Sequence, residues 1–162
     1  MLARMGNALR ILAGPTALRV LREEGFDRDA FSVMAGASGG AKWLVISGLD
    51  RVLATHFVAG RRNKLFLIGS SIGAWRSCCH AQADPLAAFE RFEQAYLAQR
   101  YGPRPSAAEV SAVSRGILES LLGPYGVTEI LAHPLLRMNL TAVRARHLAA
   151  TETPWAQQLV LA

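Results

Sequence analysis

Two segments of the form Gly-x-Ser-x-Gly, each directly after an apolar run, set the strongest limit on the fold of this chain. The run at residues 31–35 precedes GASGG at 36–40, and the run at 64–68 precedes GSSIG at 69–73. Each run has the length of a buried β-strand, and each glycine segment leads into residues with helical apolar spacing. Strands that alternate with helices in this way predict a parallel α/β sheet with right-handed crossovers.

The spacing of the other apolar residues completes the expected order of elements. Strands are expected at residues 9–13, 31–35, 64–68 and 138–143. Helices are expected at residues 17–24, at 41–56, at 72–83 and within a helical segment over about 85–133. Asp84 and Ser106 are suited to cap two helices of that segment, Ser106 in a capping box with Glu109. The helix at 41–56 is expected to be deeply buried, because apolar residues occupy more than one of its faces.

The predicted fold class is therefore α/β. We expect a three-layer α/β/α arrangement with a mostly parallel sheet, formed as one domain by residues 1–162, with the helical segment beside the sheet.

Composition limits the classes of partner. The chain has 162 residues and a formal net charge of +6, but its arginines are scattered along the sequence. Scattered basic residues are typical of a solvated surface, so we expect no nucleic-acid partner. A phosphate-binding P-loop is excluded, because Lys42 does not follow Gly40 directly and Trp43 stands where Ser or Thr is required.

The two cysteines, Cys78 and Cys79, are adjacent in the sequence. Neighbouring cysteines rarely bridge each other, because the ring that they would close is strained, so we expect free thiols on a helix and no metal site. No run approaches the roughly 20 apolar residues that a membrane span needs. These features predict a cytoplasmic protein without a metal or other cofactor.

Either serine of the glycine segments is a candidate nucleophile. A sharp turn from a strand into a helix projects a serine from the edge of the sheet and directs the next backbone N–H at the substrate oxygen. The flanking residues are glycines because such a turn is crowded. Ser38 and Ser71 both stand at the centre of such a segment.

The order of these segments resembles that of the patatin-like phospholipases. AGPTA at residues 13–17 is followed by a helix that closes with EEG at 23–25, and then by a strand and GASGG. The wider segments GASGGAKW, GLDRVL and GSSIGAWR are similar to a bacterial branch of that family. The resemblance covers about residues 8–80.

The resemblance implies a lipid acyl hydrolase that uses a serine–aspartate dyad. Carried over by position, Ser38 is the nucleophile, the N–H of Gly39 is one oxyanion donor, and Gly14 marks the second donor region. In a rival assignment Ser71 is the nucleophile, and Gly39, Gly40 and Lys42 belong to the oxyanion loop. We favour Ser38, because the strand and helix upstream of it have no role in the rival assignment.

Two departures from the family pattern affect the expected activity. Pro15 in the first loop has no N–H to donate. The family's aspartate lies in an Asp-Gly-Gly or Asp-Gly-Ala turn, and no aspartate of this chain is followed by glycine. We therefore expect a chain truncated before the base, with little or no activity. The alternative is a non-catalytic binding or regulatory module that keeps the glycine segments as structural turns.

The expected substrate is a lipid or another acyl ester, with peripheral contact to a membrane as a further expectation. Lys42 and Arg76 each lie in the first turn after a glycine segment, where a basic side chain is suited to an anionic head group.

Overall fold

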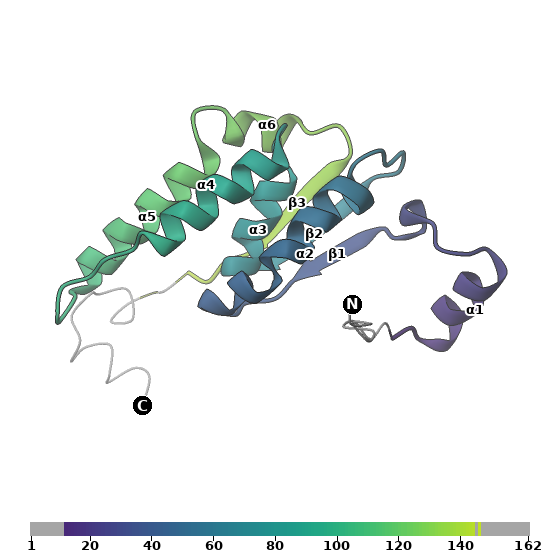
Figure 1. The fold of residues 1–162 in the computed structure, drawn as a ribbon, viewed down its shortest axis with the longest axis horizontal. Coiled ribbons are helices and arrows are strands. Elements are labelled where there is room, and N and C mark those ends of the chain that lie inside the picture. Colours follow the sequence, from purple (N-terminus) through teal and green to yellow (C-terminus); the bar gives the residue numbers. More distant parts are fainter. Residues whose placement is uncertain (1–11, 145, 147–162) are drawn as a thin grey trace, which may run out of the picture.

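Three parallel strands form the sheet of the computed structural model, which describes residues 12–144 and 146. They are β1 (Val33–Gly36), β2 (Leu65–Ser70) and β3 (Leu136–Thr141), in the order β1-β2-β3. Figure 1 shows the strands side by side, with helices in front of them. The α/β class and the parallel sheet are confirmed.

The register of the sheet divides its side chains between two faces. Leu67 of β2 is paired with Met34 and Met138, and Ile68 with Ala35 and Asn139. Because successive residues of a strand point to opposite faces, Leu65 and Leu67 share one face and Phe66 and Ile68 the other. The first face is the core, where Leu65 and Leu67 are both 0% exposed.

The helices are bounded as follows: α1 Pro15–Glu23, α2 Ser47–Val52, α3 Ile72–His80, α4 Pro85–Leu97, α5 Ala107–Leu122 and α6 Gly126–Ala132. Three short helices of other types are η1 (Arg28–Ala30), η2 (Gly40–Ile46) and η3 (Leu53–Val58). Helix α3 contacts all three strands, and α4 packs against α2, α3 and α5. The helical segment beside the sheet is therefore confirmed, in the form of α4, α5 and α6.

The described residues form two of the three expected layers. Val33, Phe66 and Ile68 of the second face are 50%, 43% and 43% exposed. No helix of residues 12–144 covers them, so the described part has two layers. The apolar runs predicted a sheet covered on both faces. An apolar residue in a strand indicates that its face should be covered, but it does not show which segment covers that face.

The N-terminal part of the described chain lies apart from the sheet. Helix α1 has no buried residue, and Figure 1 shows it beyond the amino end of β1. Of the strand expected at 9–13, residues 9–11 lie outside the described residues, whereas Leu12 and Ala13 are not in a strand.

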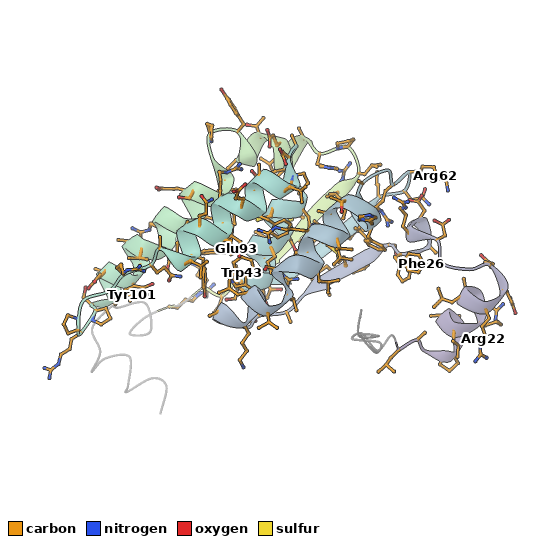
Figure 2. All side chains as sticks on the ribbon, viewed as in Figure 1. Arg22, Phe26, Trp43, Arg62, Glu93 and Tyr101 are labelled. Carbon is orange, nitrogen blue, oxygen red and sulfur yellow. The ribbon has the colours of Figure 1, made fainter. Side chains whose placement is uncertain are left out.

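The helix expected at 41–56 is divided into three short helices. Residues 40–46 form the 3₁₀-helix η2, 47–52 the α-helix α2, and 53–58 the π-helix η3. The expected deep burial was wrong, because Val45 and Val52 are 87% and 52% exposed. Only one side of this segment packs on the rest of the protein, and Trp43 (Figure 2) and Asp50 lie on that side.

The expected caps are confirmed in part. The side chain of Asp84 accepts a hydrogen bond from the N–H of Ala87, and that of Ser106 accepts one from the N–H of Glu109. The carboxylate of Glu109 accepts the N–H of Gly102. Ser106 is therefore a single cap at the start of α5.

Both cysteines are free thiols on α3, as expected. Burial raises the pKa of the Cys78 thiol to about 11 and that of Cys79 well above its ordinary value. The two side chains therefore remain protonated at neutral pH.

Candidate functional site

Ser71 stands in a sharp turn between β2 and α3. Its backbone dihedrals are φ 51° and ψ −129°. Among the residues that the structure describes, no other non-glycine residue has a positive φ. A positive φ is strained for a residue with a side chain and is found where the surrounding structure enforces it. The turn therefore holds an exposed serine at the carboxyl end of the central strand.

The glycines around Ser71 are required by close backbone contacts. A Cβ on Gly69 would lie 2.6 Å from the backbone of Ala74, and a Cβ on Gly73 would lie 2.1 Å from the carbonyl oxygen of Gly36. Both distances are far below normal van der Waals contact. The second contact joins the turn of Ser71 to the loop that contains Ser38, so the two glycine segments are packed against each other.

Ser38 lies in this neighbouring loop, after β1. Its hydroxyl is 3.0 Å from that of Ser70, the residue before Ser71. Gly39 has φ 179° and ψ 2°, and Gly40 has φ +52°, which favours glycine. Ser38 itself does not have positive φ, and a 3₁₀-helix follows it. The backbone at Ser38 therefore differs from the strained turn that we expected there.

Two amide groups near the serines are suited to hold an anionic oxygen. The N–H of Ile72 belongs to the first turn of α3, where backbone N–H groups lack intrahelical acceptors. The N–H of Gly39 takes part in none of the turn or cap hydrogen bonds of the described residues. The macrodipole of α3 adds positive potential at the same end.

Two tryptophans fix the segments that follow the serine loops. The ring of Trp43 in η2 stacks on Phe92 of α4 with a centroid distance of 4.3 Å, and Trp75 of α3 lies 5.8 Å from the same ring. Phe92 is 0% exposed. The two loops are thus tied to one buried aromatic residue, and Trp43 is buried whereas Trp75 is half-buried.

Arg76 and Asp50 form a buried ion pair below the two loops. The guanidinium donates from Nε to Oδ2 at 2.7 Å and from Nη2 to Oδ1 at 2.5 Å, while Nε2 of His80 lies 3.7 Å from Oδ1. Burial would raise the pKa of the Asp50 carboxyl, but His80 and Arg76 outweigh it and hold the pKa below its ordinary value. Asp50 is therefore an anion with 0% exposure.

The other predicted site residues are separated from one another. Arg76 is turned toward Asp50 with only 15% of its side chain exposed, which differs from the expected contact with a head group. Lys42 is exposed on η2. Gly14 caps α1, and Figure 1 places that helix far from the serine turn, so the expected role of Gly14 as an oxyanion donor region has no support in this arrangement.

The described aspartates already have partners of their own. Asp29 accepts the N–H groups of Arg62 and Asn63, Asp27 accepts that of Asp29, and Asp84 caps α4. Within the described residues, no hydrogen bond joins the hydroxyl of Ser71 to a carboxylate or an imidazole. Of the four histidines of the chain, His147 lies outside the described residues.

Two residues of this site were missed by reasoning from the sequence. Ser70 was passed over because only the central position of each Gly-x-Ser-x-Gly segment was considered. Asp50 lies in the quoted segment GLDRVL, where an aspartate with an arginine partner one helix away cannot be distinguished from a surface residue by spacing.

Comparison with known proteins gives no relative for this chain: no family model, curated protein or solved structure matches it. None of the described helices is long and apolar enough to cross a membrane. No group of three His, Cys, Asp or Glu side chains suited to a metal ion occurs among the described residues.

Proposed function

We propose that this chain has the nucleophile and oxyanion elements of a patatin-like serine acyl hydrolase, with Ser71 as the nucleophile. The observation that carries the proposal is the strained backbone of Ser71 at φ 51°, between β2 and α3. A strained strand-to-helix turn of this kind exposes a serine hydroxyl to substrate. The proposal takes up the rival assignment and not Ser38, which lacks this conformation.

The proposed reaction is acyl transfer from an ester. Ser71 Oγ attacks the ester carbonyl and forms a new C–O bond, the N–H groups of Ile72 and Gly39 stabilise the oxyanion, and the alcohol then leaves. Water subsequently hydrolyses the acyl-enzyme and releases the acid. The glycine segment at 36–40 supports this role, because it packs directly against the turn of Ser71 through Gly36 and Gly73.

The weak point of the catalytic machinery is the base. The proton of Ser71 must pass to an acceptor, and the described residues place no carboxylate or imidazole in hydrogen bond with it. Loss of a catalytic base commonly lowers the rate by several orders of magnitude. We therefore expect slow turnover from these residues alone, on lipid or other acyl esters.

A fluorophosphonate ester probe tests this assignment, because attack by serine on phosphorus expels fluoride and leaves a stable adduct. We expect adduct formation at Ser71, detected by mass spectrometry of peptides, to be lost in Ser71→Ala and retained in Ser38→Ala. Labelling at Ser38 instead would restore the first assignment.

A non-catalytic binding module is the second candidate. The observation that favours it is the same lack of a base beside Ser71 among the described residues. In that case the strained turn serves to pack α3 against the loop at 36–40. Absence of labelling at both serines, in protein whose circular dichroism shows a folded state, would support this module.

A further inference from the structure

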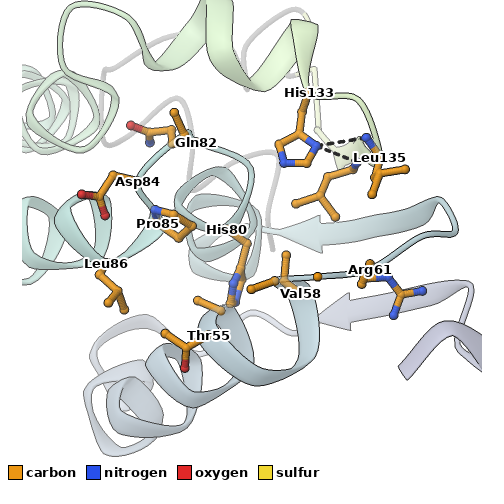
Figure 3. Close-up of a pocket in the computed structure, with 15 residues that line it drawn as sticks. Thr55, Val58, Arg61, His80, Gln82, Asp84, Pro85, Leu86, His133 and Leu135 are labelled. Carbon is orange, nitrogen blue, oxygen red and sulfur yellow. Dashed lines mark hydrogen bonds between the residues drawn. The ribbon is translucent and has the colours of Figure 1, made fainter. Parts of the chain in front are cut away.

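A second candidate site lies at the amino ends of the strands, whereas the serines lie at their carboxyl ends. A pocket of about 500 Å³ is formed by η3, by the turn before β2, by the connection from α3 to α4, and by the residues before β3. Figure 3 shows these four segments around it. Its volume is within the range of small-molecule sites, and it is separate from the loops of Ser38 and Ser71.

The walls of the pocket are mainly apolar. Ala54 and Val58 come from η3, Leu86 from α4, and Leu135 from the segment before β3. Such walls favour the apolar body of a ligand by removing its surface from water.

His133 gives the pocket a hydrogen-bond donor of fixed position. Its Nδ1 accepts the backbone N–H groups of Leu135 and Leu136, at 3.1 and 2.9 Å, so the ring proton is on Nε2. Burial, with the nearby charge of Arg137, lowers the pKa of His133, and the ring is therefore neutral at pH 7. In Figure 3 the other ring nitrogen is directed toward the space between His133 and Pro85.

His80 supplies a second polar group that has no partner. The residue is 2% exposed and lines the pocket, and its Nδ1 is buried without a hydrogen bond among the described residues. Its Nε2 faces the Asp50 carboxylate, an acceptor, and therefore carries the proton. With the proton on Nε2, Nδ1 is left as an acceptor. A buried acceptor without a partner destabilises the protein, and a ligand donor would satisfy it.

The other polar side chains of the pocket are already engaged. Arg61 donates to the carbonyl groups of Arg28 and Phe31, and Figure 3 shows its guanidinium directed away from the two histidines. Gln82 donates to the carbonyl of Leu121 and accepts from Arg91.

Asp84 is similarly occupied, since its carboxylate caps α4, and Thr55 donates to the carbonyl of Arg51. Each charged side chain of the pocket therefore has at least one hydrogen-bond partner among the described residues, although Nε of Arg61 is buried without one. Its chemistry favours an uncharged ligand.

We propose that this pocket binds a small uncharged molecule with an apolar body and a head that both accepts and donates hydrogen bonds, such as a primary carboxamide. The carbonyl oxygen accepts from Nε2 of His133, the amide N–H donates to Nδ1 of His80, and the apolar body contacts Val58 and Leu86. This inference does not depend on the activity of Ser71.

Benzamide is the probe that tests the pocket, titrated into the full chain and followed by the imidazole signals of the histidines in NMR spectra. We expect a saturable shift of the His80 and His133 signals with a Kd of about 10 mM or tighter, and no saturable shift of His56, which does not line the pocket. Benzoate is expected to bind at least about tenfold more weakly, because the guanidinium of Arg61 already donates to two carbonyl groups and is directed away from the histidines.

A matched pair of variants localises the binding. Leu86 and Leu97 are both exposed residues of α4, at 43% and 58%, but only Leu86 lines the pocket. Leu86→Trp is expected to fill the pocket and weaken benzamide binding at least about tenfold, whereas Leu97→Trp leaves it unchanged. Because both side chains are exposed, neither variant threatens the core.

Three results would overturn the proposal. A benzamide titration without saturable shifts of the His80 and His133 signals would show that benzamide does not bind in this pocket. Equal benzamide binding by both tryptophan variants would show that it binds elsewhere on the protein. Tighter binding by benzoate than by benzamide contradicts the uncharged ligand class.

Discussion

Arg76 of α3 holds the carboxylate of Asp50 in α2 through two hydrogen bonds of 2.7 and 2.5 Å, in a place where Asp50 has no exposure to water. The pair connects the helix that follows Ser71 with the segment that follows Ser38. Both serine loops therefore rest on one charge pair, on the common contact with Phe92 and on the contact between Gly36 and Gly73.

We predict that Arg76→Met strongly destabilises the protein. The change leaves the Asp50 carboxylate buried beside His80 alone, and loss of one partner of a buried pair costs about 3–5 kcal/mol. The free energy of unfolding in urea measures the effect. Arg19→Met is the control, since Arg19 pairs with Glu23 on the exposed surface of α1 and is expected to contribute about 0–1 kcal/mol. An equal loss of unfolding free energy in the two variants would show that the pair of Arg76 and Asp50 does not stabilise the site more than a surface pair does.

Gly73→Ala is predicted to disrupt the contact between the two serine loops. The added Cβ would lie 2.1 Å from the Gly36 carbonyl oxygen, so one backbone segment must move. Overpacking of this kind costs about 1–3 kcal/mol, and the movement should also abolish fluorophosphonate labelling of Ser71.

The matched control for this variant is Gly116→Ala on α5, where no atom lies within 4 Å of the new Cβ. Alanine is favoured over glycine within a helix by roughly 0.5–1 kcal/mol, so this control is expected to be as stable as the parent chain or more so. The prediction fails if Gly73→Ala matches Gly116→Ala in both unfolding and labelling.

Asp29 should make the stability of the protein depend on pH in the acid range. Its carboxylate accepts the N–H groups of Asn63 and Arg62 and the Nε–H of Arg62, and these contacts lower its pKa to about 2. A lowered pKa in the folded state stabilises the protein fully above the unfolded pKa of roughly 4, and this contribution is lost as the pH falls toward 2.

The test is the difference in unfolding free energy between the parent chain and Asp29→Asn. We expect the variant to be less stable at pH 7 and the difference to shrink steadily between about pH 4 and pH 2, measured by urea unfolding at each pH. A difference of the same size at pH 7 and pH 2 would contradict the assigned role of the Asp29 charge.

Much of the fold could be predicted from the sequence, because its elements depend on local patterns. The runs at 31–35 and 64–68 became β1 and β2, and Asp84 and Ser106 begin α4 and α5, since apolar spacing and helix caps act within a few residues. The parallel arrangement follows from the alternation of strands and helices. The wrong predictions concern burial, for example at Val45 and Phe66, which depends on segments far away in the sequence.

The candidate site shows the same division. The sequence by itself determined that two serines stand in glycine-rich turns after strands, because the spacing of glycines and apolar residues is local information. Only the tertiary structure distinguished the two turns, by giving Ser71 a positive φ and by bringing Gly36 against Gly73. The physical reason is that backbone strain and buried charge pairs, such as that of Arg76 with Asp50, persist only where distant parts of the chain pack together to enforce them.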